Sequence, residues 1–244
     1  MTGVHQSPIN IIDKINTKDD PHSSIQFLYQ LEKEFAESYQ KLKYDGRGLS
    51  LKAEIGKMIF THADGTQEVF EANQIEFHYP SEHTITLNSQ TPRYPLEIHI
   101  IHRFIKTSNR NATNLNIQVK KAIISILFKG DSEIIEGDAF LSSLGIDDRL
   151  KRPDGTFRTV KKGEYIDSTE NWLGNVKPGF DINALIALKD LLNFDHWIFR
   201  YYGSDTQPPC TEDAHRFVFA IPRSANKVQI DFLKAQLMKQ KGCY

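Results

Sequence analysis

Residues 96–102 read Leu96-Glu97-Ile98-His99-Ile100-Ile101-His102, and this stretch decides the fold because it alternates apolar and polar side chains. Such alternation predicts a half-buried β-strand. A second stretch of the same kind lies upstream, Gln74-Ile75-Glu76-Phe77-His78-Tyr79. The two stretches together hold an unusual concentration of imidazole and carboxylate groups, so the functional side chains are expected on a sheet.

Side chains two residues apart face the same side of a strand. Gln74, Glu76 and His78 therefore share one face of the first strand, and Glu97 and His99 share one face of the second. If the strands are neighbours, Glu76, His78 and His99 converge. Two imidazoles and one carboxylate form a ligand set that zinc accepts, and an open fourth position suits hydrolytic or hydration chemistry. The alternative, favoured by alternation alone, is a set of hydrogen-bonded polar side chains on a half-buried sheet.

Further short β-rich runs extend the pattern over most of the chain, so a mostly β fold is predicted. These runs are residues 49–54, 58–62, 117–128 and 216–221. Helical spacing occurs twice. Residues 183–192 follow Asp181, a suitable N-cap, and place their leucines on one face. Residues 25–42 show a similar spacing, but their Phe and Tyr residues would suit a strand equally well.

Composition and charge exclude several classes of protein. The 244 residues are 39% hydrophobic and 25% charged, and their formal net charge of -1 lacks the basic excess that binding to nucleic acid requires. The longest apolar run, residues 122–128, is far shorter than the ~20 residues of a membrane-spanning helix. Residues 1–5 lack the features of a signal peptide, so a cytoplasmic location is expected, with an organelle left open if the N-terminus is processed.

The chain is expected to form one domain over residues 1–244, with a divergent surface excursion at residues 131–175, where the composition turns polar and glycine-rich. The two cysteines, Cys210 and Cys243, are expected to be free thiols in a reducing compartment, with a disulfide between them as the alternative. Three histidines stand in no motif and are expected to be ordinary polar residues: His62, His196 and His215.

Four motifs in order resemble those of the α-type carbonic anhydrase family. They are Gln6-Ser7-Pro8-Ile9-Asn10-Ile11, Ser81-Glu82-His83-Thr84, the stretch from Glu97 to His102, and Tyr201-Tyr202-Gly203-Ser204-Asp205-Thr206-Gln207-Pro208-Pro209-Cys210. The resemblance is weak over residues 131–175 and after Pro222. It implies a large, twisted, mainly antiparallel central sheet with short surface helices. It also implies a zinc ion held by three histidines from two adjacent strands.

One of the three ligand positions departs from the family. His78 and His99 match the second and third zinc ligands, but Glu76 stands where the first histidine belongs. Gln74 and Glu97 match the partners that orient the first and third histidines. A carboxylate ligand cancels part of the charge on zinc, so bound water should ionise less readily. Partners built for imidazole also argue against tight binding, so zinc is expected to be weakly bound or absent.

Further departures point the same way. Arg47 stands at the family's proton-shuttle histidine, and a permanently charged guanidinium relays no proton near neutral pH. Arg216 replaces a tryptophan that lines the apolar pocket for carbon dioxide; it should bring charge into the cavity or turn away from it. Thr206 and Glu82 match the pair that orients zinc-bound hydroxide, and here their structural role is expected to dominate.

The resemblance and its departures imply a carbonic anhydrase-related protein with a degraded zinc site, one that acts as a structural or protein-binding scaffold or as a subunit of a larger assembly. The competing hypothesis is a weak zinc-dependent carbon dioxide hydratase that uses His78, His99 and Glu76 as ligands. A third candidate is binding of bicarbonate or another small anion, with Arg47 or Arg216 as the charge partner.

Overall fold

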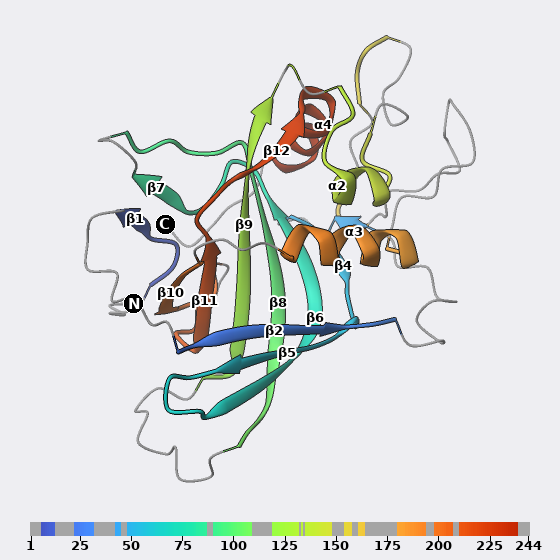
Figure 1. Ribbon diagram of the computed structural model, residues 1–244. Coiled ribbons are helices and arrows are strands. Elements are labelled where there is room, and N and C mark those ends of the chain that lie inside the picture. Colours follow the sequence, from blue (N-terminus) through green and yellow to red (C-terminus); the bar gives the residue numbers. More distant parts are fainter. Residues whose placement is uncertain are drawn as a thin grey trace.

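A ten-stranded sheet, most of whose ladders are antiparallel, forms the centre of the molecule (Figure 1). The computed structural model describes residues 6–12, 22–31, 42–44, 48–86, 90–108, 119–131, 133, 135–147, 154–157, 161–163, 180–193, 198–206 and 210–238. The sheet runs in the order β10-β11-β9-β8-β6-β4-β3, with β12 beside β9, and with β5 joining β2 to β6. Strands β11 and β12 both run parallel to β9, and a separate parallel pair joins β1 to β7.

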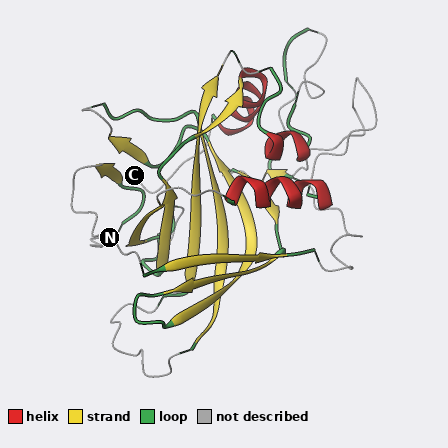
Figure 2. Ribbon diagram, in the orientation of Figure 1, coloured by secondary structure: helices red, strands yellow, loops and turns green. Residues whose placement is uncertain are grey.

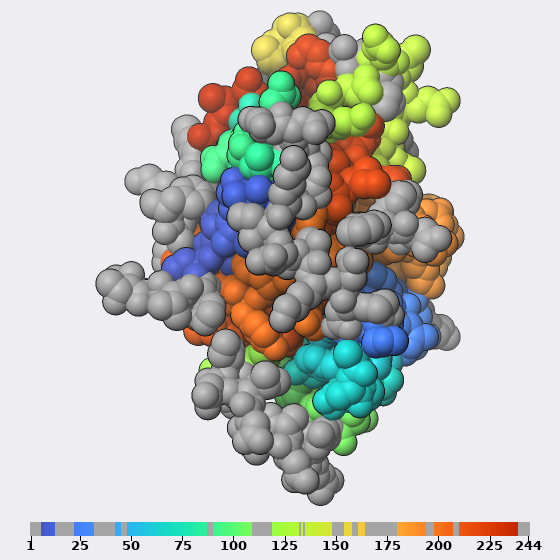
Figure 3. Space-filling view, turned by 60° about the vertical axis from the view of Figure 1, so that its left-hand side comes forward, coloured from blue at the N-terminus to red at the C-terminus, as the bar shows by residue number. Residues whose placement is uncertain are grey.

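The strands have the following bounds: β1 Asn10–Ile12, β2 Ser24–Tyr29, β3 Lys43–Tyr44, β4 Leu49–Lys52, β5 Gly56–Thr61, β6 Gln67–His78, β7 Thr84–Thr86, β8 Leu96–Thr107, β9 Lys121–Asp131, β10 Ile198–Gly203, β11 Ala214–Phe219 and β12 Arg223–Asn226. In Figure 1, β2 and β5 cross the lower ends of the long strands. The space-filling view shows β1, in blue, against the green segment that contains β7 (Figure 3). The predicted mostly β, twisted sheet is confirmed.

Strand β6 changes the face on which it presents its side chains part-way along its length. A register shift against β8 between Ala72 and Gln74 marks a bulge at Asn73. Before the bulge, Glu68, Phe70 and Ala72 are buried on one face. After it, Ile75 and Phe77 continue that buried face. The residues after the bulge that alternate with them, from Gln74 onward, consequently point to the other side of the sheet.

Three helices lie on the sheet or beside it (Figure 2): α2 Ala139–Ser143, α3 Ile182–Leu192 and α4 Lys227–Leu237. Asp181 caps α3 by accepting hydrogen bonds from the backbone N–H groups of Asn183 and Ala184, as predicted. Helix α4 begins at Asn226 with a capping box that includes Gln229. The sequence reading missed α4, although Asn226 and Gln229 stand at the spacing that signals such a start.

The structure decides one open alternative and overturns one expectation. Residues 24–29, for which helix and strand were both open, form strand β2, which pairs with β5 and packs apolar side chains on the core. The expected surface excursion at 131–175 is wrong for its described middle part, since Phe140, Leu141 and Ile146 are buried in the main core. Leu144 is buried with them, so α2 and the residues directly after it pack against the core.

Within the described residues, no helix is both long enough and apolar enough to cross a membrane. Cys210 is disulfide-bonded, which contradicts the expectation of free thiols. Cys243, the other cysteine of the chain, lies outside the described residues. A disulfide is typical of proteins from oxidising compartments.

Candidate metal site

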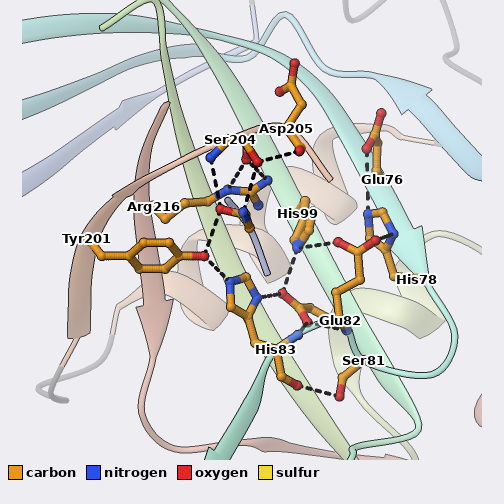
Figure 4. A network of polar contacts seen from close by, with 12 residues as sticks. Glu76, His78, Ser81, Glu82, His83, His99, Tyr201, Ser204, Asp205 and Arg216 are labelled. Carbon is orange, nitrogen blue, oxygen red and sulfur yellow. Dashed lines mark hydrogen bonds and ion pairs between the residues drawn. The ribbon is translucent and has the colours of Figure 1, made fainter. Parts of the chain in front are cut away.

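The candidate metal site is assembled by the register of two neighbouring strands. Glu76 on β6 pairs with His99 on β8, and His78 pairs with Glu97. One ligand atom from each of Glu76, His78 and His99 lies within 4.8 Å of the others. The Oε2 atom of Glu76 is 3.6 Å from Nε2 of His78. The predicted convergence of these three side chains is therefore what the structure contains (Figure 4).

Glu97 organises the buried side of this site. Its Oε1 accepts hydrogen bonds from Nε2–H of His99 at 2.6 Å and from Nδ1–H of His83 at 2.5 Å. Its Oε2 accepts from the backbone N–H groups of Glu82 and His83, both at 2.8 Å. Burial alone would raise the pKa of Glu97, but His83 and His99 outweigh burial and hold that pKa well below its usual range. An ionised Glu97 thus fixes the ring of His99 and leaves Nδ1 as the atom free to face the site.

Gln74 supports Glu76 in a way that the sequence analysis did not expect. Its side-chain amide donates a hydrogen bond to Oε1 of Glu76 at 3.0 Å. The amide group carries both an acceptor and a donor, so it can orient a carboxylate as readily as an imidazole. The expectation that the surrounding residues disfavour a carboxylate at position 76 is therefore wrong for Gln74.

Glu82 lies close to both histidines and raises the pKa of His78. Its Oε1 is 3.2 Å from Nδ1 of His78, and its Oε2 is 3.8 Å from Nε2 of His99. Burial lowers the pKa of His78, but Glu82 and Glu76 more than compensate and raise it to about 10. Burial and the charge on His78 lower the pKa of His99 to about 4. For Glu82, the two histidines overcome burial and lower the pKa to about 2.

Thr206 is buried, but it is not joined to Glu82 by a hydrogen bond in the described part of the chain. Thr206 and Glu82, the pair that by resemblance would orient a hydroxide, therefore do not form the hydrogen bond that this role needs. Glu82 instead makes its closest side-chain contact with His78.

The side chain of Arg216 is fully buried. Its Nε and Nη2 groups donate to the carbonyl oxygen of Ser204 at 3.0 Å and 2.6 Å. Its Nη1 group is buried without a hydrogen-bond partner. Its positive charge acts with burial to lower the pKa of His99. Arg216 therefore does not turn out to the solvent, which was one of the two outcomes expected for it.

The first motif of the chain is hydrogen-bonded to the segment that contains Tyr201 and Ser204. Ser7 and Ser204 are joined reciprocally: the N–H of Ser7 donates to Oγ of Ser204 at 2.9 Å, and the N–H of Ser204 donates to Oγ of Ser7 at 3.0 Å. A side chain at Gly203 would overlap with Oγ of Ser7, so this close approach needs glycine. The hydroxyl of Tyr201 lies 2.6 Å from Nε2 of His83 and 3.1 Å from Ser7.

The sequence reading did not identify Tyr201, Ser204 or Ser7 individually as parts of the site, although their motifs were recognised. Arg47, expected at the proton-shuttle position, lies outside the described residues, as does His196.

The three candidate ligands suit zinc. Ligands of a tetrahedral zinc stand ~3.3 Å apart, given bonds of about 2.0–2.2 Å. The observed 3.6 Å between Glu76 Oε2 and His78 Nε2 is close to that value. Three carboxylates surround the position, since Glu82 contacts His78 and Glu97 contacts His99 beside Glu76 itself. Their negative charge favours a dication, and a set of two histidines and one glutamate is a known catalytic zinc set.

Comparison with known proteins agrees with the fold and the motifs. The family model described as eukaryotic-type carbonic anhydrase matches residues 1–243. Alpha carbonic anhydrase 7 of Arabidopsis thaliana is 27% identical over 237 residues, which are 95% of this chain and 66% of that relative. A carbonic anhydrase of Pectobacterium atrosepticum is 24% identical over 94% of this chain and 71% of its own length. The chain thus spans about two thirds of these relatives.

Solved structures show the same fold at lower sequence identity. Dioscorin complexed with ascorbate has a TM-score of 0.62 at 23% identity, covering 97% of this chain and 78% of dioscorin. The alpha-carbonic anhydrase of Photobacterium profundum has a TM-score of 0.57 at 22% identity, covering 98% and 84%. With the family model matching nearly the whole chain, the protein belongs to the eukaryotic-type carbonic anhydrase family.

Proposed function

We propose that this chain binds one zinc ion through Glu76, His78 and His99 and hydrates carbon dioxide far more slowly than a three-histidine site would. The observation that carries the proposal is the position of Glu76, whose Oε2 lies 3.6 Å from His78 Nε2 and whose Oε1 is held by Gln74. In such a site zinc supplies a Lewis acid that makes bound water more acidic, and a carboxylate ligand weakens this effect.

The residues around the ligands support weak hydration. Glu82 contacts His78 at 3.2 Å instead of Thr206, so a hydroxide would lack its orienting pair. Arg216 places a full positive charge inside the protein near His99, where a small apolar substrate would need an uncharged wall. A hydroxide that is not oriented reacts more slowly, and so does a substrate that lacks an apolar wall. Neither loss prevents a metal from binding.

Substitution of Glu76 by histidine tests the proposal. In protein saturated with zinc, Glu76→His should raise the rate of carbon dioxide hydration by about tenfold or more over the wild type, measured by stopped flow. Zinc affinity should rise as well, measured by competition with a chelator of known affinity. The matched control is Glu71→His on the same strand, because Glu71 is exposed and pairs with Lys57 and Arg103 outside the site. This control should change neither quantity.

Two results would overturn this proposal. A zinc-loaded wild type that hydrates carbon dioxide as fast as Glu76→His would show that the carboxylate does not weaken the site. An equal zinc affinity of the wild type and Glu76→Ala would show that Glu76 is not a ligand.

With hydration weakened, we infer that the retained fold acts mainly by binding: as a structural scaffold for a protein partner, or within a larger assembly. Gel filtration and light scattering of the complex from the source organism would test this, and a purely monomeric native protein would contradict it.

Binding of a small anion is the second candidate, and one observation favours it. Nη1 of Arg216 is fully buried without a hydrogen-bond partner, and a buried donor of this kind is costly unless something accepts from it. Bicarbonate should therefore raise the thermal unfolding temperature of the wild type and not that of Arg216→Met. Arg103→Met, at an exposed position, should respond like the wild type. A flat response of the wild type to bicarbonate would remove this candidate.

A further inference from the structure

A second cluster of potential ligands lies on the opposite face of the sheet from the candidate metal site. It consists of His62, Glu68 and His215, one ligand atom of each lying within 4.8 Å of the others. His62 directly follows β5, Glu68 begins the buried face of β6, and His215 lies on β11. Strands β5 and β6 are paired neighbours, whereas β11 is separated from β6 by β9 and β8 in the sheet order. The three segments meet because β2 and β5 cross the lower ends of the long strands (Figure 1).

The geometry of this cluster is close to that of a metal site. Oε2 of Glu68 is 3.1 Å from Nε2 of His62 and 2.9 Å from Nε2 of His215. Ligands of a tetrahedral zinc stand ~3.3 Å apart, so an ion would require only small movements of the three side chains. His215 is fully buried and Glu68 is 6% exposed. The side chain of His62 is 20% exposed, which leaves a route from the solvent.

Contacts within the cluster satisfy its buried groups only in part. Oε2 of Glu68 and both ring nitrogens of His215 are buried without any hydrogen bond of acceptable geometry. Nε2 of His215 lies 2.9 Å from Oε2 of Glu68, whereas Nδ1 of His215 is buried with no partner among the described residues. Such groups are rare in native proteins and require an explanation. Oε2 of Glu68 contacts a ring nitrogen of both histidines, so the three side chains converge on one point, as ligands do around an ion.

The surroundings hold the rings of the cluster in place. Phe60 packs edge-on to His62 with ring centroids 4.5 Å apart, and Tyr202 lies against His215 at 4.6 Å. Phe217 and Phe70 close the inner side. Rigid ligands in an apolar shell lose little conformational freedom when an ion binds.

We propose that His62, Glu68 and His215 form a second, structural divalent-metal site that takes zinc. Two imidazoles and one carboxylate favour a transition metal over calcium or magnesium, which prefer all-oxygen sites. The ion ties the hairpin of β5 and β6 to β11, so it stabilises the fold without taking part in chemistry at Glu76. In Figure 3 the cyan surface of this hairpin lies directly beside the orange surface of the β10 region, where such a tie would act.

Zinc titration of the full chain tests the second site. The wild type, stripped with a chelator and then dialysed against zinc, should retain two zinc ions per chain by elemental analysis. His62→Asn should retain one, and Glu76→Ala should retain one as well. The matched control is His22→Asn, since His22 is exposed and lies outside both clusters; it should retain two. Because His62 is at the edge of the core, the His62→Asn protein is expected to fold.

A thermal measurement separates a structural ion from loose surface binding. Zinc at roughly one hundred times its dissociation constant should raise the unfolding temperature of Glu76→Ala, which keeps only the second site, by about 5–10 °C. The double variant Glu76→Ala with His62→Asn should show no such rise. Equal zinc content in the wild type and His62→Asn would overturn the second site. An unchanged unfolding temperature of Glu76→Ala on addition of zinc would overturn its structural role.

Discussion

His215 and Arg216 are neighbours in the chain, yet their side chains lie in two different polar clusters on opposite faces of β11. His215 pairs with Tyr202 and faces Glu68, whereas Arg216 pairs with Tyr201 and donates to Ser204. The alternation of one strand thus serves both sites. Both clusters hold two histidines and a glutamate, but only the one beside Arg216 resembles the metal centre of the family.

Glu97→Gln should weaken zinc binding at Glu76, His78 and His99. Glu97 is the charged acceptor that holds Nε2–H of His99, and loss of such a partner lowers metal affinity by about 10–100-fold. Competition with a zinc chelator measures the effect. Glu54→Gln is the control, because Glu54 makes only a surface ion pair with Lys52. An affinity unchanged by Glu97→Gln would contradict the role given to Glu97.

Acid should destabilise the protein through His102. Nδ1–H of His102 donates to the carbonyl of Ala122, and its Nε2 accepts from the hydroxyl of Tyr29 at 2.5 Å. Burial lowers the pKa of His102 to about 4, below the ordinary value of about 6.5. Between these pH values His102 is protonated in the unfolded chain but stays neutral in the folded chain. Stability therefore falls as the pH falls from about 6.5 to 4, by about 3 kcal/mol for this group.

Chemical denaturation at several pH values across that interval measures the slope. His102→Gln should show a shallower fall in the free energy of unfolding than the wild type, and the exposed His22→Gln should keep the wild-type slope. An equal slope in His102→Gln and the wild type would show that His102 does not carry this dependence.

Ser7→Ala should destabilise the protein by about 1–3 kcal/mol, because it removes the buried acceptor of the Ser204 N–H group. The loop that contains Thr206 should loosen at the same time, seen as faster hydrogen exchange of residues 203–206. Ser24→Ala, at an exposed position on β2, should cost less than ~0.5 kcal/mol. Unchanged exchange of residues 203–206 in Ser7→Ala would mean that the first motif does not brace this loop.

Local patterns predicted the faces on which the candidate ligands Glu76, His78 and His99 lie, and their convergence only on the condition that the two strands are neighbours. Alternation gives the face of each side chain, and the two strands that carry them are neighbours in the sheet. The bulge at Asn73 was not predicted, although the buried apolar residues shift phase across it, from Phe70 and Ala72 to Ile75 and Phe77.

The cluster of His62, Glu68 and His215 could not be predicted from the sequence for a different reason. His62 and His215 meet only because the sheet curls so that β5 reaches β11, and no local spacing encodes that contact. Strand β2 was left open between helix and strand because its apolar residues fit both periods, and its pairing with β5 decides between them. Helix α4, in contrast, carried a readable capping signal in Asn226 and Gln229.

The most direct test of the central claim is an anomalous difference map, recorded at the zinc absorption edge, from crystals of the wild type grown with zinc. The account predicts a peak within bonding distance of one carboxylate oxygen of Glu76, Nε2 of His78 and the Nδ1 atom of His99. A zinc peak bound by His78 and His99 with Glu76 turned away, or the absence of a peak at this position, would contradict it.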